Sequence, residues 1–511
     1  MTHFDMGVEG MNTIVYYKKR RVVMQRIKLN WIIGIVMTLI FISLLAVRLG
    51  VFQKGEVRIT GLASISSVPS EGETWMNIFQ KDQKIGYVHR LFLKTGEGYR
   101  VMESVFMRIN TMGMVQDIRF RTVGDLNHHL ALSTFDFELQ SSLFKFKARG
   151  GITGNTLTLY SGPTGIEQKF DLPIEQEISL PAGVIALLAN EDLKEGDSRT
   201  FHVFDPISMA QRSMKMTVLA EETISVMNQE ERAKKLSVDF MGTPQFAWIG
   251  KDGTVLREEG ALGIRLERTT QKEALRKDTF SESSDLTEAA SVLANRSIPN
   301  ANELKELRVI LEGMGTDRLL LDGGRQSFKE KVLTVRKEPV LNLTTEKKRE
   351  FKGEWTKYLE ATPFIQSAHP EIQAKAKEIV SKEDSDVVRT TKLVNWVHQN
   401  IQKRPVFSVP NALETLRNRV GDCNEHAVLL AALARASGIP AEIEAGLVYQ
   451  NGRFYYHAWN VLHLGRWITA DAVMGQFPAD VTHLRFVRGT ESQIDLMQMI
   501  GKVRLEILSA F

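Results

Sequence analysis

The only cysteine of the chain, Cys423, stands between a turn-forming Gly-Asp pair and an alanine- and leucine-rich stretch. The order Gly421-Asp422-Cys423 before an apolar run predicts a helix that begins at the cysteine, with Asp422 as its cap. Unpaired amide groups and the positive end of the helix dipole meet there, and they favour a thiolate over a thiol. A cysteine in this position has the chemistry of a nucleophile.

A histidine and an aspartate follow on a predicted hairpin. His457 lies in FYYHAWNVL and Asp471 in GRWITAD, on strands expected over residues 454–462 and 466–471. With a three-residue loop between the strands, facing positions sum to 928, and His457 faces Asp471 at about 5 Å. With a two-residue loop they sum to 930, and Asp471 faces Trp459. Only the first register places imidazole and carboxylate side by side, which is how a base is oriented towards a nucleophile.

An oxyanion intermediate would need two hydrogen-bond donors. The backbone N–H of Cys423 is the first donor that the sequence predicts. Asn411 and Asn418 are candidates for the second, because they lie close to Cys423 in the chain. The sequence does not choose between them.

Three stretches in this region resemble a known family. They are GDCNEHAVLLAALARASGIPAEIEAGLVY, FYYHAWNVL and GRWITADAVMGQFPADVTHLRFVRG, and together they resemble the bacterial transglutaminase-like domain of the papain-type cysteine enzymes over about residues 350–495. The resemblance implies Cys423 as nucleophile, His457 as general base and acid, and Asp471 as the residue that orients the histidine. It also implies attack on a carboxamide or peptide carbonyl to give an acyl-thioenzyme, whose acyl group passes to an amine or to water. One position departs from the family, since Ala472-Val473 follow the aspartate where Pro-Thr is usual.

Two alternatives compete with a catalytic thiol. Cys423 and His426 are spaced i and i+3 on one helix, and with His457 and Asp471 they would complete four zinc ligands. Only this ligand count favours zinc, and no phosphate-binding loop or dinucleotide fingerprint is present, so no metal or cofactor is predicted. In the second alternative the cysteine is a buried apolar residue, and the chain is a catalytically inactive scaffold or binding protein.

The first half of the chain must form strands. From residue 58 to residue 275 apolar and polar residues alternate between turn signals; in LSTFDFEL, for example, Phe135 and Phe137 share a face opposite Asp136. This pattern predicts an antiparallel β domain over 58–275 with one buried face, covered by a helix over 181–190.

The second half is predicted to combine helices and strands. Residues 276–303 are polar and poorly periodic, as in a linker, and 304–347 indicate two strands of a small β subdomain or bridge. Residues 348–511 predict helices followed by an antiparallel meander, a transglutaminase-like α+β domain. At 511 residues and 43% apolar composition the chain can form two or three domains, and the predicted fold class of the whole is α+β.

The N-terminus predicts a membrane anchor. Residues 1–30 carry six Lys and Arg and two Asp and Glu, which is the whole formal charge of +4. This basic tail precedes a charge-poor, apolar run over 31–52, long enough for a transmembrane helix. Basic residues on its N-terminal side predict a cytoplasmic tail and a single-pass protein of the bacterial inner membrane, with its bulk facing the periplasm or the exterior. A cleaved signal peptide is the alternative, but no small-x-small cleavage site follows the run.

The predicted partners follow from the same features. They are a protein or peptide substrate and, through residues 31–52, the membrane. A remainder of zero net charge argues against nucleic acid. The sequence predicts no oligomeric state.

Overall fold

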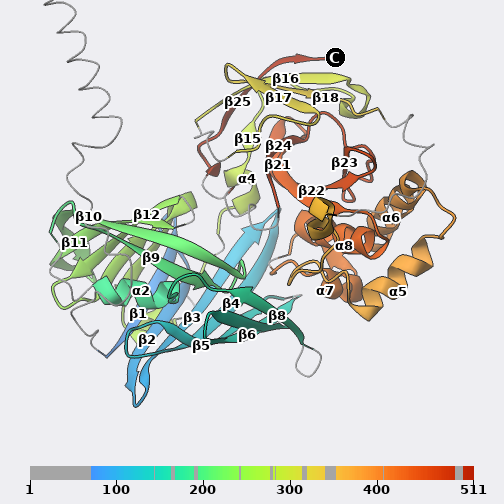
Figure 1. Ribbon diagram of the computed structural model, residues 1–511. Coiled ribbons are helices and arrows are strands. Elements are labelled where there is room, and N and C mark those ends of the chain that lie inside the picture. Colours follow the sequence, from blue (N-terminus) through green and yellow to red (C-terminus); the bar gives the residue numbers. More distant parts are fainter. Residues whose placement is uncertain are drawn as a thin grey trace, which may run out of the picture. The chain divides into compact units, whose positions relative to one another are not determined.

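The computed structural model describes residues 71–339 and 353–511 apart from short gaps (Figure 1). The gaps are 143, 163–166, 189–193, 241–242, 277–279, 282, 314–318, 407, 490–495 and 497–498. Strands hold 50% of the described residues and helices 18%. The α+β class predicted from the sequence is therefore wrong: the described chain is mostly β. The reason is that the long alternating segments of the first half all join one sheet.

Fourteen strands form this large antiparallel sheet, in the order β8-β7-β6-β5-β4-β3-β2-β1-β14-β13-β12-β11-β10-β9. The strands are β1 Gly72–Gln80, β2 Gln83–Thr95, β3 Gly98–Thr111, β4 Met114–Leu126, β5 Leu132–Gln140, β6 Lys145–Thr153, β7 Thr156–Ser161, β8 Gln168–Pro173, β9 Ser198–Asp205, β10 Ala210–Val226, β11 Gln229–Phe240, β12 Thr243–Gly250, β13 Val255–Glu259 and β14 Ile264–Thr269. All neighbours are consecutive in the chain except β1 and β14. That single non-local pairing joins two meanders into one sheet.

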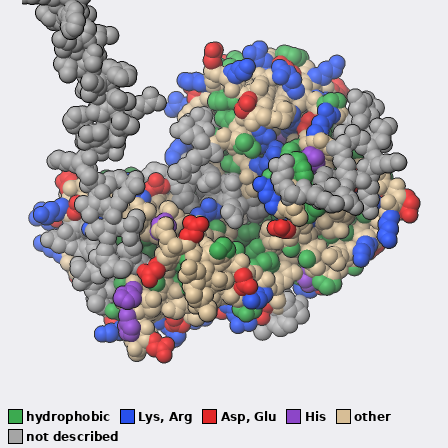
Figure 2. All heavy atoms as spheres, viewed as in Figure 1, with side chains coloured by type: hydrophobic (Ala, Val, Ile, Leu, Met, Phe, Trp, Pro, Cys, Tyr) green, Lys and Arg blue, Asp and Glu red, His purple; other side chains and the backbone are tan. Residues whose placement is uncertain are grey.

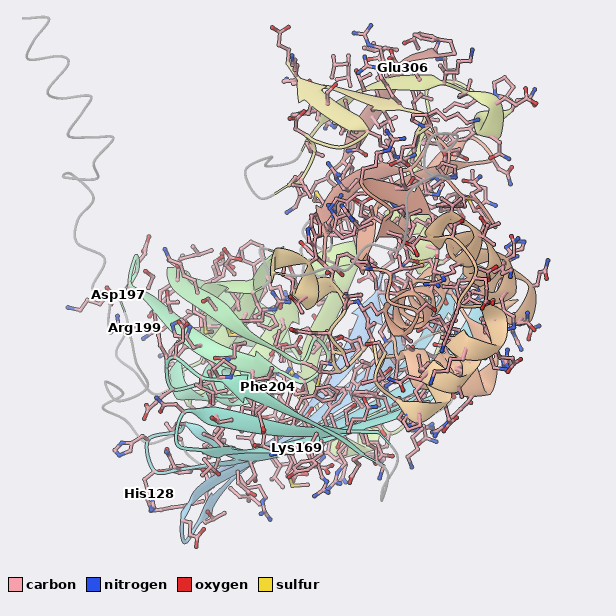
Figure 3. The ribbon with its side chains drawn as sticks, turned by 45° about the vertical axis from the view of Figure 1, so that its right-hand side comes forward. His128, Lys169, Asp197, Arg199, Phe204 and Glu306 are labelled. Carbon is pink, nitrogen blue, oxygen red and sulfur yellow. The ribbon has the colours of Figure 1, made fainter. Side chains whose placement is uncertain are left out.

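One face of the large sheet is buried. On β5, Phe135, Phe137 and Leu139 are buried and Asp136 is exposed, which confirms the predicted alternation. Phe204 on β9, labelled in Figure 3, is fully buried. Its ring centroid lies 4.9 Å from that of Phe135, although β5 and β9 are far apart in the strand order. The sheet therefore curves, and its apolar face becomes the inside of the curve.

Helix α2 (Pro181–Leu188) covers part of this buried face, as the sequence predicts. It contacts β3 and β9, and Val184 is fully buried there. Leu180, just before the helix, packs directly on β4 at Gly124, where an added Cβ would lie 2.2 Å from Leu180 Cδ1. Glycine at this position therefore lets the start of the helix approach the sheet.

Charged side chains of both signs are exposed on one face of the molecule. On the face drawn in Figure 2, Lys and Arg side chains are interspersed with Asp and Glu. His128 and His129 are exposed in the turn between β4 and β5, at the outer end of the sheet (Figure 3). A surface of mixed charge marks no site by itself.

A second, four-stranded sheet has the order β17-β18-β16-β25. Its strands are β16 Glu306–Glu312, β17 Gln326–Lys329, β18 Val332–Arg336 and β25 Arg504–Ala510. The sequence predicts two strands over 304–347, and the structure has three there, completed by a strand from the C-terminal end of the chain. The predicted domain boundaries are not tested by these pairings and stay predictions.

The remaining elements pack helices against a five-stranded sheet with the order β15-β22-β21-β24, in which β23 also pairs with β22. The main elements are α5 Pro370–Ile379, α6 Asp386–Asn400, α7 Ala412–Asn418, α8 Cys423–Ala436, β15 Val292–Leu293, β21 Ala441–Gln450, β22 Arg453–His463, β23 Trp467–Ala470 and β24 Leu484–Arg488. Shorter ones are α3 Gln271–Ala274, α4 Leu286–Ala290, β19 Gln402–Lys403, β20 Val420–Gly421 and 3-10 turns at Ala261–Gly263, Ala301–Glu303 and Gly353–Tyr358. The helix that begins at Cys423 and the strands predicted over 454–462 and 466–471 are confirmed to within one residue.

Helix α8 is buried on all sides. Every residue from Ala427 to Ala434 is at most 2% exposed, and the helix packs against β21, β22 and helices α5, α6 and α7. A helix that is apolar all round belongs in a core. Gly438 follows it with φ +81°, the left-handed conformation that commonly ends a helix. A helix fixed in this way holds its first residue, Cys423, in a constant position.

The predicted membrane anchor is not supported. Residues 1–30 and the predicted span 31–52 lie outside the described residues. Among the helices that the structure does describe, none is long and apolar enough to cross a bilayer. The longest, α6, has 15 residues, whereas a span needs about 20. The predicted single-pass localisation in the inner membrane therefore finds no support among the described residues.

A buried glutamate ties the five-stranded sheet together. Glu444 on β21 is 2% exposed and accepts hydrogen bonds from Arg488 at 2.6 Å, from Arg485 at 3.3 Å and from Trp459 Nε1 at 3.0 Å. Burial alone would raise the pKa of Glu444, but the charges of Arg488 and Arg485 outweigh it and hold the pKa below its usual range.

Glu444→Ala should lower the free energy of unfolding by about 3–5 kcal/mol at pH 7, because it leaves the buried guanidinium group of Arg485 and the half-buried one of Arg488 without their anion. Urea unfolding followed by circular dichroism measures this loss. The depressed pKa adds stability above the unfolded pKa and loses it as the pH falls, so the deficit should shrink below about pH 4. Glu312→Ala removes an exposed partner of Lys331 and should stay close to wild type. A similar loss of stability in both variants would show that the ion pairs of Glu444 contribute no more than the exposed pair of Glu312 and Lys331.

Candidate active site

Cys423 is the first residue of α8, where the sequence predicts it. Asp422 caps the helix through its side chain, which accepts from the backbone N–H of Asn424 at 2.9 Å. The side chain of Glu425 returns to the N–H of Asp422 at 3.0 Å and completes a capping box. The two reciprocal bonds fix the backbone on both sides of the thiol.

The charge of the thiol differs from the expectation drawn from the helix dipole. Burial raises the pKa of the Cys423 thiol well above its usual range, and the carboxyl groups of Asp422, Glu425 and Asp471 raise it further. A hydrogen bond from the backbone N–H of Ala458 to the sulfur acts in the opposite direction. At rest the sulfur is therefore a thiol, and a nearby base must take its proton before it can attack.

The structure brings His457 and Asp471 together, but not by the facing register. Asn460 faces Ala470 and Leu462 faces Ile468, so paired positions sum to 930 rather than 928. Despite this register, His457 Nε2 lies 2.7 Å from Asp471 Oδ2. Strand β23 ends one residue before the aspartate, and the chain turns there, which aims the carboxylate diagonally at the imidazole.

Asp471 is held from both of its oxygens. It is fully buried, and Oδ1 accepts from the backbone N–H groups of Val473 at 2.7 Å and Met474 at 3.0 Å. Its backbone also pairs with Gln476 in both directions. These bonds use amides beyond position 472, so alanine in place of the family's proline leaves the carboxylate anchored. Burial alone would raise the pKa of Asp471, but His457 and then His483 outweigh it and hold the pKa well below its usual range.

A second histidine, which sequence reasoning missed, shares this carboxylate. His483 Nε2 lies 2.9 Å from Asp471 Oδ2, and its Nδ1 lies 3.2 Å from Asp480 Oδ1. His483 is fully buried, with Trp459 edge-on at 5.2 Å between ring centroids. The only sequence signal was the Asp480-Val-Thr-His483 spacing, which by itself marks a turn as readily as a site.

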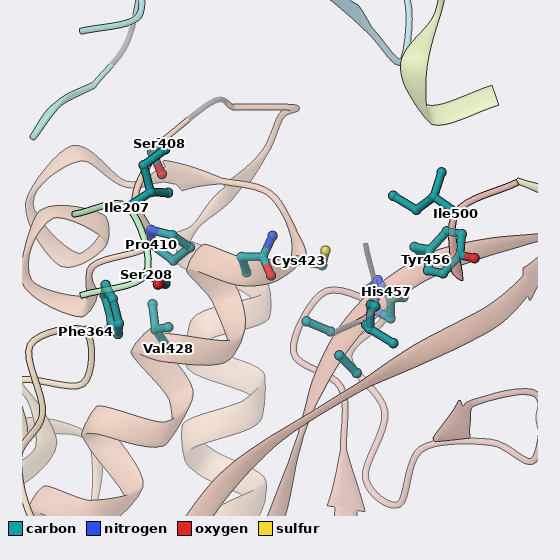
Figure 4. Close-up of a pocket in the computed structure, with 14 residues that line it drawn as sticks. Ile207, Ser208, Phe364, Ser408, Pro410, Cys423, Val428, Tyr456, His457 and Ile500 are labelled. Carbon is teal, nitrogen blue, oxygen red and sulfur yellow. The ribbon is translucent and has the colours of Figure 1, made fainter. Parts of the chain in front are cut away.

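Cys423 and His457 line one pocket of about 370 Å³ (Figure 4). Its described lining is Ile207, Ser208, Phe364, Ser408, Pro410, Cys423, Asn424, Val428, Ala445, Tyr456, His457, Ala458, Leu496 and Ile500. The sulfur of Cys423 points towards the side of the pocket on which His457 and Tyr456 lie (Figure 4). The hydroxyl groups of Ser208 and Tyr456 are buried without a hydrogen-bond partner among the described residues, so they are available to a ligand.

The predicted second oxyanion donors do not reach the pocket. The side chain of Asn411 accepts from the N–H of Glu414 at 3.0 Å and caps α7, and neither it nor Asn418 is part of the described lining. Asn424, next to Cys423 in the first turn of α8, does line the pocket. By position, its side chain is a nearer candidate for the second donor than Asn411 or Asn418.

The zinc alternative does not form. In the described parts of the chain one group of three side chains brings ligand-type atoms within 4.8 Å of one another, and it consists of His457, Asp471 and His483. Cys423 and His426 are not in it, and His426 Nδ1 is bonded instead to a carbonyl oxygen of its own helix turn at 2.6 Å. The contacts of Asp471 with both histidines have hydrogen-bond lengths, so no metal site is assigned.

Comparison with protein families finds a match for one part of this chain. Residues 373–472, which include Cys423, His457 and Asp471, match the model of the transglutaminase-like superfamily. Comparison with curated proteins finds no match.

Solved structures show weaker likeness. A candidate cysteine protease from Cytophaga hutchinsonii is 14% identical, with 41% of this chain and 89% of that one covered and a TM-score of 0.27. A beta-barrel-like protein from Brucella abortus is 9% identical, with 40% and 98% covered and a TM-score of 0.31. The periplasmic domain of TgpA from Pseudomonas aeruginosa is 17% identical, with 41% and 77% covered and a TM-score of 0.23. TM-scores this low carry no functional argument; by the family match, residues 373–472 form a transglutaminase-like domain.

Proposed function

We propose that this chain is a thiol-dependent amide hydrolase that acts on proteins or peptides through an acyl-thioenzyme. One observation carries the proposal: Cys423 and His457 line the same pocket, and the imidazole is hydrogen-bonded on its far side to the buried carboxylate of Asp471. This is the order of nucleophile, base and orienting carboxylate that thiol catalysis requires.

The proton transfers follow from which ring nitrogen of His457 is hydrogen-bonded to Asp471. Because Nε2 of His457 donates to Asp471, Nδ1 carries the free lone pair and accepts the proton of the Cys423 thiol. The sulfur attacks the amide carbonyl and an S–C bond forms. The backbone N–H of Cys423 and the side-chain amide of Asn424 then donate to the oxyanion. The C–N bond then breaks as His457 returns the proton to the leaving amine. Water, deprotonated by the same imidazole, releases the acid and restores the thiol.

The lining of the pocket indicates the substrate class. Phe364, Pro410, Val428, Leu496 and Ile500 make most of its wall apolar. Burying an apolar side chain next to the reacting amide would gain about 25 cal/mol for each Å² removed from water. We therefore expect a peptide amide flanked by an apolar residue to be preferred over a charged one.

The same lining favours water over an amine as the acyl acceptor. A primary amine is a cation at neutral pH, and no aspartate or glutamate is present among the described lining residues to attract it. Hydrolysis is therefore proposed as the main reaction, with transfer to an amine as the minor one.

A peptide library incubated with the protein and a biotinylated primary amine tests the proposal. Mass spectrometry distinguishes cleaved peptides, deamidated glutamine and amine adducts in one experiment. Wild type should give cleavage next to apolar residues, and Cys423→Ala should give none. Products that persist in Cys423→Ala would exclude the thiol as nucleophile.

An inactive scaffold is the competing function, and the raised pKa of the buried Cys423 thiol is the observation that favours it. A scaffold predicts slow alkylation by iodoacetamide that rises with pH as for an isolated buried thiol. An enzyme predicts faster alkylation that depends on His457. Comparing alkylation rates of wild type and His457→Ala separates the two.

A further inference from the structure

His483 lies beside the proposed catalytic residues Cys423, His457 and Asp471, but the proposed reaction does not require it. It lies outside the pocket lining, fully buried, and its two ring nitrogens face two different carboxylates. Nε2 is 2.9 Å from Asp471 Oδ2, the oxygen that also receives His457 at 2.7 Å. Nδ1 is 3.2 Å from Asp480 Oδ1.

We propose that His483 is a positioning residue that, as a buried imidazolium held between Asp471 and Asp480, clamps the orienting carboxylate and sets the charge felt by the Cys423–His457 pair. The inference rests on the proposed function for its role in catalysis. The charge and the clamp themselves are properties of the fold and can be measured without a substrate.

The contacts of the ring require the cation. An ionised carboxylate only accepts hydrogen bonds, so both nitrogens of His483 must donate, and an imidazole with two N–H groups is positively charged. Burial alone would lower the pKa of His483, but Asp471 and Asp480 outweigh it and raise the pKa. The same cation holds the pKa of Asp480 well below its usual range, against the opposing effect of burial.

Among the described residues around His483, no other charged side chain contacts its ring. The guanidinium group of Arg325 approaches His483 only through its backbone carbonyl, at 3.2 Å, and is itself 3.8 Å from Glu338. Trp459 presents a ring edge and no charge. Asp480 is in turn fixed by Thr482 at 2.8 Å and by Gln476 at 2.9 Å, so the clamp continues into the following turn.

The cation has a predictable effect on the reacting pair. The ring centroids of His483 and His457 are 5.9 Å apart, and like charges at that distance oppose each other. His483 therefore disfavours protons on the groups around it, and its removal should let the reacting pair keep its protons to higher pH. Coulomb's law at 5.9 Å with an effective dielectric constant of about 20–80 gives a displacement of roughly 0.5–2 pH units.

His483→Gln tests the charge, because the glutamine amide can still donate to Asp471 but is neutral. The readout is the rate of Cys423 alkylation by iodoacetamide between pH 5 and pH 10, followed by intact mass. The rise of this rate should move to higher pH by about 0.5–2 units relative to wild type. A uniform loss of rate with an unmoved profile would reveal a purely structural residue and overturn the proposal.

Long-range ¹H–¹⁵N spectra of wild type and Asp480→Asn provide a measurement that survives if His483→Gln fails to fold. In wild type at pH 7.5 both ring nitrogens of His483 should be protonated, and in Asp480→Asn its titration should move to lower pH. A wild-type His483 with one bare nitrogen at pH 7.5 would refute the clamp. Because neither experiment uses an amide substrate, a chain without amide activity could still carry the imidazolium, and the two failures remain distinguishable.

Discussion

Cys423→Ser should lower amide turnover by at least about 10⁴-fold while the protein remains folded. A serine hydroxyl is a far poorer nucleophile than a thiol beside the same imidazole, and loss of the nucleophile removes nearly all of the catalysis that a triad supplies. Turnover of a peptide amide flanked by apolar residues, followed by mass spectrometry, measures the loss. Thermal unfolding should change little, because the substitution replaces sulfur with a smaller oxygen in a side chain of the same shape at the first residue of α8.

The chain offers an internal control for this experiment. Cys423 is the only cysteine among 511 residues, so every thiol adduct reports on this position. Wild type should take up one equivalent of iodoacetamide and lose activity in parallel, and Cys423→Ser should take up none. Activity of the serine variant within tenfold of wild type would place the nucleophile elsewhere.

Asp471→Asn should lower turnover by about 10³- to 10⁴-fold, although it changes the shape of the side chain little. The amide nitrogen of asparagine would face Nε2 of His457 as a donor, so the imidazole would turn its unprotonated nitrogen there and its N–H towards the sulfur. In that tautomer it cannot accept the thiol proton. Steady-state kinetics should show a fall in kcat with little change in KM, since the carboxylate does not line the pocket.

Asp171→Asn is the matched control for this change. Asp171 lies exposed on β8, bonded to Thr158 and Lys169, and its loss should leave turnover unchanged. Circular dichroism must confirm that Asp471→Asn is folded, because the variant also leaves His483 with one anion fewer. Equal activity of the two variants would show that His457 needs no orienting carboxylate.

The sequence alone determined the features that depend on local physics. A Gly-Asp pair before an alanine-rich run is enough to start a helix at Cys423, because the cap and the helix propensity act within one or two turns. Period-two alternation is enough to place Phe135 and Phe137 inside the large sheet, because a strand shows its two faces in any context. The pairing of His457 with Asp471 could be proposed, since both residues sit on one predicted hairpin.

Only the tertiary structure decided the rest, because it depends on contacts between distant segments and on exclusion of water. The paired positions of the hairpin sum to 930, the register in which His457 does not face Asp471 across the strands. The turn after β23, held by hydrogen bonds from backbone N–H groups to Asp471, nevertheless brings the two side chains together. The helix dipole favours a thiolate at Cys423, but burial under β22 outweighs it, and burial cannot be read from neighbouring residues. His483 reaches Asp471 only because β24 begins beside β21 in the folded sheet. The joining of two meanders into one fourteen-stranded sheet likewise follows from the pairing of β1 with β14, which no local pattern encodes.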